Sequence, residues 1–270
     1  MELNLLFYGV ATILYLFAGL KIVTGFKKQG DMPPLWTLGV AGLAIVAHFW
    51  VLQGAAFPAK ATMAMNFGIA VSAMCFFAVL MLIYGALYTQ VHALLGIVVL
   101  VAAVGVWGPV VFPSGHSLLV GAPLSFKLHI AMGLVAYAFM MMAVVQAILM
   151  GILDRRLRNH QALSEPAGLI ASMPDLMSTE RMLFRFVFAC FLFLLLTIAG
   201  GMLSSTQIAD AALFGHKTVM TMTSCAIFGV LLLGRRFCGW RSRQALTVFW
   251  LAVACQVIAY LAYRFVLDVL

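Results

Sequence analysis

The sequence predicts an all-α, polytopic integral membrane protein with eight transmembrane helices and both termini on the outer, periplasmic side. Of its 270 residues, 65% are hydrophobic and 9% are charged, whereas a soluble domain carries about 25% charged residues. The apolar residues gather in eight stretches, each long enough for the roughly 20-residue helix that crosses a bilayer. Because these runs are continuous rather than alternating, they exclude a β-barrel.

The eight predicted spans follow one another through a single membrane domain, residues 1–270. We place them at Leu3–Phe26, Leu35–Leu52, Ala61–Tyr88, Val91–Val111, Phe126–Ile152, Met182–Leu203, Phe214–Leu233 and Ala245–Phe265. The first has no positively charged n-region and no cleavage site, which predicts a retained helix rather than a signal peptide. The longest connection, at about residues 153–181, is predicted to be an inner loop and does not resemble a separate domain.

The basic residues set the predicted orientation. With the N-terminus outside, twelve of the 16 Lys and Arg residues fall on the inner side, which is the positive-inside bias of membrane proteins. The four on the outer side are Lys60, Lys127, Lys217 and Arg264. The formal net charge of +8 is therefore a signal of topology, and we expect no nucleic-acid partner. The pattern predicts a multi-pass protein of the bacterial inner membrane.

Three of the six histidines share one predicted depth in the outer half of the membrane. His48 lies in the second span, His129 about one turn inside the fifth, and His216 begins the seventh. Ionisable groups are costly at such depth and usually have a functional reason. The alternative is that each imidazole hydrogen-bonds a neighbouring helix and serves packing. The coincidence in depth favours a common ligand, whereas His92 and His160 lie near inner loops and are expected to be solvated.

A haem is the ligand that best suits these histidines. Neutral imidazole binds transition metals and haem iron. Zinc sites more often include carboxylates or thiolates, but the five cysteines stand alone and the outer half has few acidic residues. Haem also needs cations for its propionates, and Lys127, Lys217 and Arg264 lie near the three histidines. The alternative for the lysines is snorkelling at helix ends. The pattern predicts a b-type haem, either resident or cargo.

Five segments in order carry a family resemblance. They are "LHIAMGLVAYAFMMMAVVQAILM" (Leu128–Met150), "MPDLMSTERMLFR" (Met173–Arg185), "HKTVMT" (His216–Thr221), "GWRSRQA" (Gly239–Ala245) and "LAYRFVLDVL" (Leu261–Leu270). Together they resemble the YpjD-like branch of the cytochrome c assembly protein family, which includes CcsA, CcmC and HemX-related inner-membrane proteins. The resemblance implies a membrane protein that handles haem and presents it at the outer face for attachment to apocytochrome. It also implies that His129 is an external histidine of that family.

The sequence is compatible with two functions of different classes. In the first, which we expect, the protein binds or traffics haem near the outer face through histidines of separate helices, without enzymatic chemistry. In the second, a haem-free membrane interaction or regulatory protein binds another membrane protein through its Arg-rich inner loops, Arg155–Arg158 and Arg235–Arg243. The His/Lys pairs favour the first. The family's tryptophan-rich segment has no counterpart in Gly200–Thr218, which favours the second. A solute transporter would need inverted repeats or broken helices, and no convincing repeat is present.

Overall fold

The described part of the chain consists mainly of long helices, together with a short pair of strands. The computed structural model describes residues 2–25, 34–59, 62–112, 118–121, 123–158, 173–204, 216–240 and 242–259. The elements in these ranges are α1 (Glu2–Gly25), α2 (Leu35–Ala56), β1 (Thr62–Ala64), α3 (Phe67–Ala86), α4 (His92–Gly105), α5 (Gly108–Val111), β2 (Leu118–Val120), α6 (Leu124–Arg158), α7 (Leu176–Ser204), α8 (His216–Cys238) and α9 (Ser242–Val257).

Each predicted span overlaps a helix in the described residues, but the start of the third, Ala61–Tyr88, contains β1, and α3 begins only at Phe67. Seven helical segments are long and apolar enough to cross a membrane, and α9 contributes a shorter apolar segment, Gln244–Val257. The predicted class of polytopic helical membrane protein is therefore confirmed. The fourth span consists of two helices, α4 and α5, which are separated at Val106 and Trp107.

Two local features differ from the prediction. The strands β1 and β2 pair antiparallel, with Thr62 opposite Val120 and Ala64 opposite Leu118. They are three residues long, which is too short for an alternating pattern to reveal. In addition, α6 continues to Arg158 and α7 begins at Leu176, so the predicted inner loop is shorter than 153–181. Hydropathy marks only the apolar part of a helix, whereas its backbone hydrogen bonds continue into charged residues.

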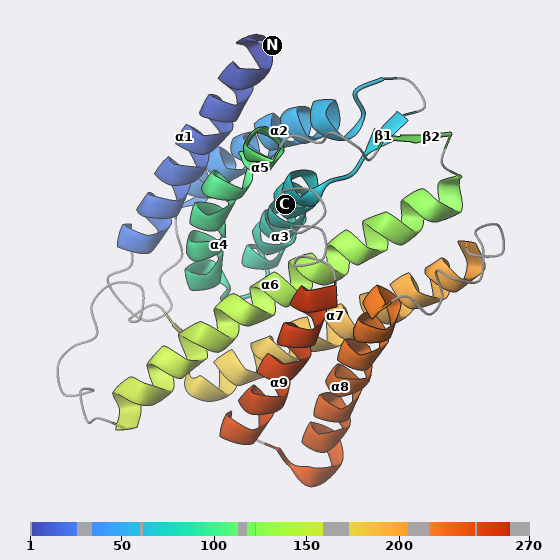
Figure 1. Cartoon of the computed structure of the whole chain (residues 1–270). Coiled ribbons are helices and arrows are strands. Elements are labelled where there is room, and N and C mark those ends of the chain that lie inside the picture. Colours follow the sequence, from blue (N-terminus) through green and yellow to red (C-terminus); the bar gives the residue numbers. More distant parts are fainter. Residues whose placement is uncertain are drawn as a thin grey trace.

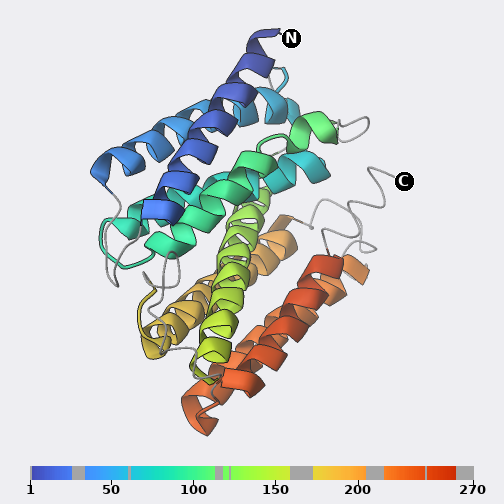
Figure 2. The same ribbon diagram turned by 90° about the vertical axis from the view of Figure 1, so that its left-hand side faces the viewer.

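The helices form three groups, and α6 belongs to the middle one. Helices α1 to α4 pack together on one side, α6 and α7 run antiparallel through the middle, and α8 and α9 lie on the other side (Figures 1 and 2). Helix α6 packs against α3 and α4 as well as α7. Its buried residues divide between two apolar clusters. Ala138 and Met142 belong to a cluster composed mainly of residues from α1 to α4, whereas Tyr137 and Met140 belong to one that joins α3 to α7, α8 and α9.

Close contacts fix the segments that lead to α6. Any side chain on Gly68 would collide with the backbone carbonyl of Gly108, so the start of α3 touches α5 directly. Asn66 caps α3, because its Oδ1 accepts a hydrogen bond from the Ile69 N–H (2.7 Å). The Asn66 Nδ2 donates to the Phe112 carbonyl (2.6 Å). These contacts and the β1–β2 pair hold together the end of the molecule where α6 begins.

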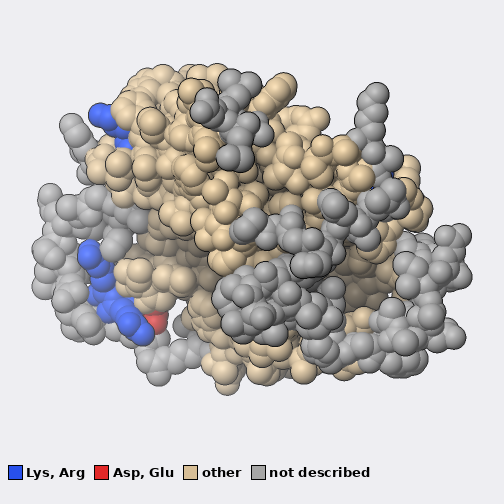
Figure 3. Space-filling view, turned by 45° about the horizontal axis from the view of Figure 1, so that its top comes forward, with Lys and Arg blue, Asp and Glu red and all other residues tan. Residues whose placement is uncertain are grey.

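Most of the described cations lie at the other end, which we call the basic end. It comprises the ends of α1, α6 and α8 and the start of α7, and carries Lys21, Arg155, Arg156, Arg181, Arg185, Arg235 and Arg236. On the face shown in Figure 3, the blue side chains are confined to the left edge and the remaining described surface is almost entirely uncharged.

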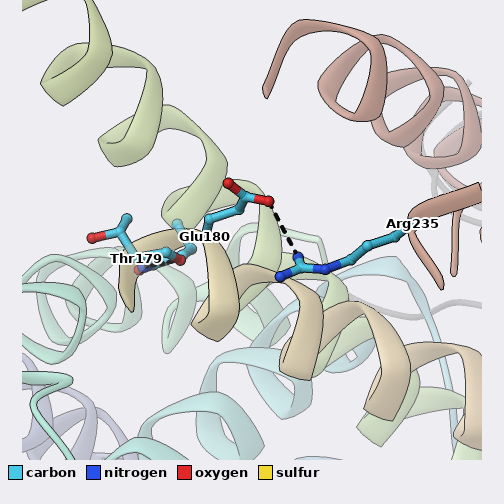
Figure 4. Close-up of polar contacts among 4 residues, drawn as sticks. Thr179, Glu180 and Arg235 are labelled. Carbon is cyan, nitrogen blue, oxygen red and sulfur yellow. Dashed lines mark hydrogen bonds and ion pairs between the residues drawn. The ribbon is translucent and has the colours of Figure 1, made fainter. Parts of the chain in front are cut away.

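An ion pair joins α7 to α8 at the basic end. The Arg235 Nη1 lies 3.5 Å from the Glu180 Oε1 (Figure 4). The Arg235 guanidinium also lies over the Phe184 ring, 3.6 Å from its centroid. Arg235 is therefore engaged in helix packing, whereas Arg155, Arg156 and Arg236 are exposed.

Candidate functional site

The predicted site residues lie on separate elements. His48 is in α2, Lys127 and His129 are in α6, and His216 and Lys217 begin α8. The start of α6, the end of α7 and the start of α8 lie at the same end of the molecule, opposite the basic end (Figures 1 and 2). His216 and Lys217 are placed by their backbone. Arg264 lies outside the described residues.

His129 is held by a hydrogen bond that defines which ring nitrogen carries its proton. Its Nδ1 lies 2.8 Å from the Thr197 carbonyl oxygen of α7. A carbonyl oxygen only accepts, so Nδ1 must donate, and in the neutral ring the lone pair is on Nε2. A backbone carbonyl bonded to the far nitrogen in this way orients histidine ligands in metal and haem sites. His129 therefore has the tautomer of an Nε2 ligand.

Two glycines of α7 make room for the His129 ring. A Cβ atom on Gly201 would lie 3.0 Å from the imidazole Cε1 and 3.3 Å from Nδ1, and one on Gly200 would lie 3.7 Å from the His129 Cβ. A larger residue at Gly201 would therefore displace the ring. On the α6 side, the Phe126 ring stacks beside the imidazole, with centroids 6.2 Å apart. The half-buried imidazole thus lies between a glycine surface and an aromatic ring.

A second polar contact lies two turns deeper on α6. Tyr137 follows His129 and Gly133 at intervals of four residues, so the three share one stripe of the helix. The Tyr137 hydroxyl donates to the Gln256 carbonyl (3.1 Å) and accepts from the Gln256 Nε2 (2.9 Å) of α9. Both side chains are buried. The stripe therefore contacts α7 at His129 and α9 at Tyr137, and its position fixes the rotation of α6.

His48 has a different environment from His129. Its side chain is 0% exposed. Its Nδ1 is hydrogen-bonded to the Tyr15 hydroxyl of α1 (3.1 Å), and its Nε2 to the Ser72 hydroxyl of α3 (2.8 Å). Both ring nitrogens are therefore used to join α2 to its neighbours, as expected of a packing histidine. These contacts lie within the α1 to α4 group, and those of His129 lie on α6 and α7.

The sequence analysis also considered Lys127, His92 and His160. Lys127 precedes His129 by two residues, which places the two about 200° apart around the helix. The lysine therefore leaves α6 on another side from the imidazole that contacts α7. The expectation that His92 is solvated was wrong, because it is 5% exposed at the start of α4, between the buried residues Val91 and Ala93. His160 lies outside the described residues.

No cluster of protein metal ligands is present in the described part of the chain, where no three His, Cys, Asp or Glu side chains gather. A haem iron needs only one or two protein ligands, because the porphyrin supplies the others. The setting of His129 fits that requirement, since one carbonyl orients the ring and two glycines leave space for it.

The sequence alone indicated His129, but not the residues that contact it or those that hold Tyr137 below it. Thr197 contributes a backbone carbonyl, which has no sequence signal. Gly200 and Gly201 are visible in the sequence as a pair, but only the contact with α6 gives them a role. Gln256 is a single buried amide in an apolar helix, and its spacing relates to no other motif.

Comparisons with known proteins agree with this architecture. The sequence profile described as "Cytochrome C assembly protein" matches residues 36–270. An uncharacterized 28.8 kDa protein of Azospirillum brasilense is 31% identical over 152 residues, covering 56% of this chain and 55% of that protein. The inner membrane protein YpjD of Escherichia coli K12 is 30% identical over 135 residues, covering 50% of this chain and 48% of YpjD. The matches thus span about half the length of these relatives, and no solved structure matches.

The profile covers most of the chain, from the second residue of α2 to residue 270. Together with the apolar helices, the relationship to YpjD gives a multi-pass bacterial inner-membrane protein. Family membership indicates a haem-related function in the membrane. The chain belongs to the cytochrome c assembly protein family, in its YpjD-like branch.

Proposed function

We propose that this protein binds b-type haem at the end of the bundle opposite the basic end, with His129 as an axial ligand. The observation that carries the proposal is the hydrogen bond from the His129 Nδ1 to the Thr197 carbonyl (2.8 Å). It holds the ring against Gly201 and gives Nε2 the lone pair that iron accepts. When bound, haem would supply an iron centre that takes imidazole ligands. The chain itself binds and orients the group and performs no enzymatic step.

His216 is the second candidate ligand. It begins α8, at the same end as the start of α6 (Figure 1). Lys127, Lys217 and Arg264 are proposed to hold the propionates. His48 suits the role least, because hydrogen bonds to Tyr15 and Ser72 occupy both of its ring nitrogens. Binding of iron would break one of these bonds and leave a buried hydroxyl without its partner.

The proposed topology has eight spans, with both termini and the haem on the outer side. α9 would be the eighth span, because its apolar sequence continues beyond Val257. The basic end then faces the cytoplasm, as the positive-inside bias requires. Haem at the opposite end would be available to a protein outside the cytoplasmic membrane.

A second candidate is a haem-free interaction or regulatory protein. The exposure of Arg155, Arg156 and Arg236 at the basic end favours it, since these cations are available to another membrane protein. Arg235 is less available, because it pairs with Glu180.

An absorption spectrum tests the proposed function. The protein is purified in mild detergent, mixed with hemin, freed of unbound hemin, and measured oxidised and reduced. We expect about one haem per chain, with a Soret band and sharp α and β bands after reduction. His160→Ala, the control, should give the same spectrum. If the folded protein binds no haem in excess hemin, the proposal is wrong and the second candidate is favoured.

A further inference from the structure

A cavity of about 550 Å³ lies between α3, α6 and α7 at the basic end, and neither histidine site touches it. This volume falls within the roughly 300–1,000 Å³ of small-molecule sites. Its buried wall includes Leu82 of α3, Val91 at the start of α4 and Met142 of α6. Most of its lining is apolar, so the part deep among the helices suits a hydrocarbon chain.

The mouth of the cavity opens where the protein meets lipid. Leu80 and Tyr84, which line it, are 44% and 66% exposed. Both belong to the apolar span α3, so their exposed surface contacts the bilayer rather than water. A ligand would therefore enter from the membrane, which favours an amphiphile over a water-soluble molecule.

The polar groups of the cavity gather toward the end of α3 and the start of α7. Arg185, in the third turn of α7, lines the cavity and is exposed. Among the described residues, no carboxylate forms an ion pair with it. Thr89 follows α3 and adds a hydroxyl, which donates to the Gly85 carbonyl (2.8 Å) and can still accept a hydrogen bond. One end of the cavity thus presents a cation, whereas the rest is hydrocarbon.

We propose that this cavity binds an anionic phospholipid, with an acyl chain between α3, α6 and α7 and the phosphate on Arg185. Arginine recognises phosphate through paired N–H donors. Basic pockets between helices at the cytoplasmic side of membrane proteins bind anionic headgroups in this way. A lipid bound in this way would tie α3 to α7. This site is independent of haem at the opposite end.

Lipid titrations of the purified protein test the proposal. Delipidated protein in detergent is titrated with phosphatidylglycerol or with phosphatidylcholine of the same chains, and the Tm gives an apparent affinity. Phosphatidylglycerol should bind about tenfold more tightly, because the choline cation of phosphatidylcholine offsets the phosphate charge that attracts Arg185. Arg185→Gln should abolish that preference, and Arg185→Lys should restore part of it. Met182→Trp, which fills the cavity, should weaken the binding of both lipids.

The matched control is Arg236→Gln, which removes the same charge from an exposed site at the same end, on α8. It should keep the preference for phosphatidylglycerol. The proposal is overturned if Arg185→Gln behaves like Arg236→Gln in a protein that elutes as wild type. It is also overturned if soluble glycerol phosphate gives the full shift in Tm, which would identify a phosphate site without a lipid. The proposal is also overturned if hemin raises the Tm in a way that requires Arg185 while phosphatidylglycerol does not raise it.

Discussion

His48 and His129 are both imidazoles within apolar helices, yet the two regions around them differ in kind. His48 is fully enclosed, and its two ring nitrogens are hydrogen-bonded to the hydroxyls of Tyr15 and Ser72. His129 is half-buried near the start of α6, its Nδ1 donates to a backbone carbonyl, and two glycines adjoin its ring. Depth in the membrane therefore does not separate the two environments, whereas the partner of Nδ1 does, because it is a side-chain hydroxyl for His48 and a backbone carbonyl for His129.

The largest expected effect is that of His129→Ala on haem binding. Removal of an axial ligand should weaken hemin affinity by at least about 100-fold, more than the loss of a residue that only orients a ligand. The measurement is a hemin titration followed by the Soret band, with the elution profile as a check of folding. Unchanged affinity in a folded variant would show that His129, like His48, does not bind the haem iron.

Gly201→Val should have the next largest effect. A Cβ atom there lies 3.0 Å from the His129 Cε1, so the larger side chain must move the ring away from Thr197. We expect hemin affinity to fall about tenfold, the effect of disturbing a ligand's orientation. The matched control is Gly133→Ala, whose Cβ would lie 3.6 Å from the Thr197 Cγ2, an ordinary contact. Equal losses of hemin affinity in the two variants would argue against a specific role of Gly201 in positioning the imidazole.

A smaller effect is expected from the lysines. Neutralising Lys127 and Lys217 together to Gln should weaken haem retention by about fivefold, since exposed ion pairs each contribute up to about 1 kcal/mol. High salt should reduce the difference from wild type, because salt screens exposed charges. Lys60→Gln is the control and should retain haem as wild type does. If the double variant loses no more haem than Lys60→Gln, the lysines serve only to anchor the helix ends.

His48→Ala should have the smallest effect on haem and a clear effect on stability. It leaves the buried hydroxyls of Tyr15 and Ser72 without their partner, at a cost of about 2–3 kcal/mol in the free energy of unfolding. We expect the Tm to fall by about 5 °C, with hemin affinity unchanged per folded molecule. Loss of haem in folded His48→Ala would instead make His48 a ligand.

The sequence predicted the helices well because hydropathy reports burial in lipid directly. Leu35 begins both the predicted second span and α2, and every other predicted span overlaps a helix. The break at Val106 and Trp107 carries a signal that hydropathy does not report, because Gly105 precedes it and Gly108 and Pro109 follow it, and these residue types interrupt helices. The pairing of β1 with β2 depends on contacts between residues far apart in the chain, such as Thr62 and Val120, which are 58 positions apart, and no local pattern encodes these.

The candidate site was predictable only in part. His129 was indicated by its cost in the membrane, and the structure adds the carbonyl of Thr197 and the space at Gly201. His48 was included among the candidate ligands, because its partners Tyr15 and Ser72 are 33 and 24 residues away and the sequence does not show them. The cavity at Arg185 gave no signal, because its lining comes from four separate segments.

The most direct test of the central claim is chemical rescue of His129→Gly with free imidazole. The variant is loaded with hemin and measured by absorption and electron paramagnetic resonance, before and after imidazole is added. If His129 is an axial ligand, the variant should lose the low-spin spectrum of wild type, and imidazole should restore it at the vacated position. His48→Gly should keep the wild-type spectrum without imidazole. A wild-type low-spin spectrum in folded His129→Gly before any imidazole is added would contradict the account.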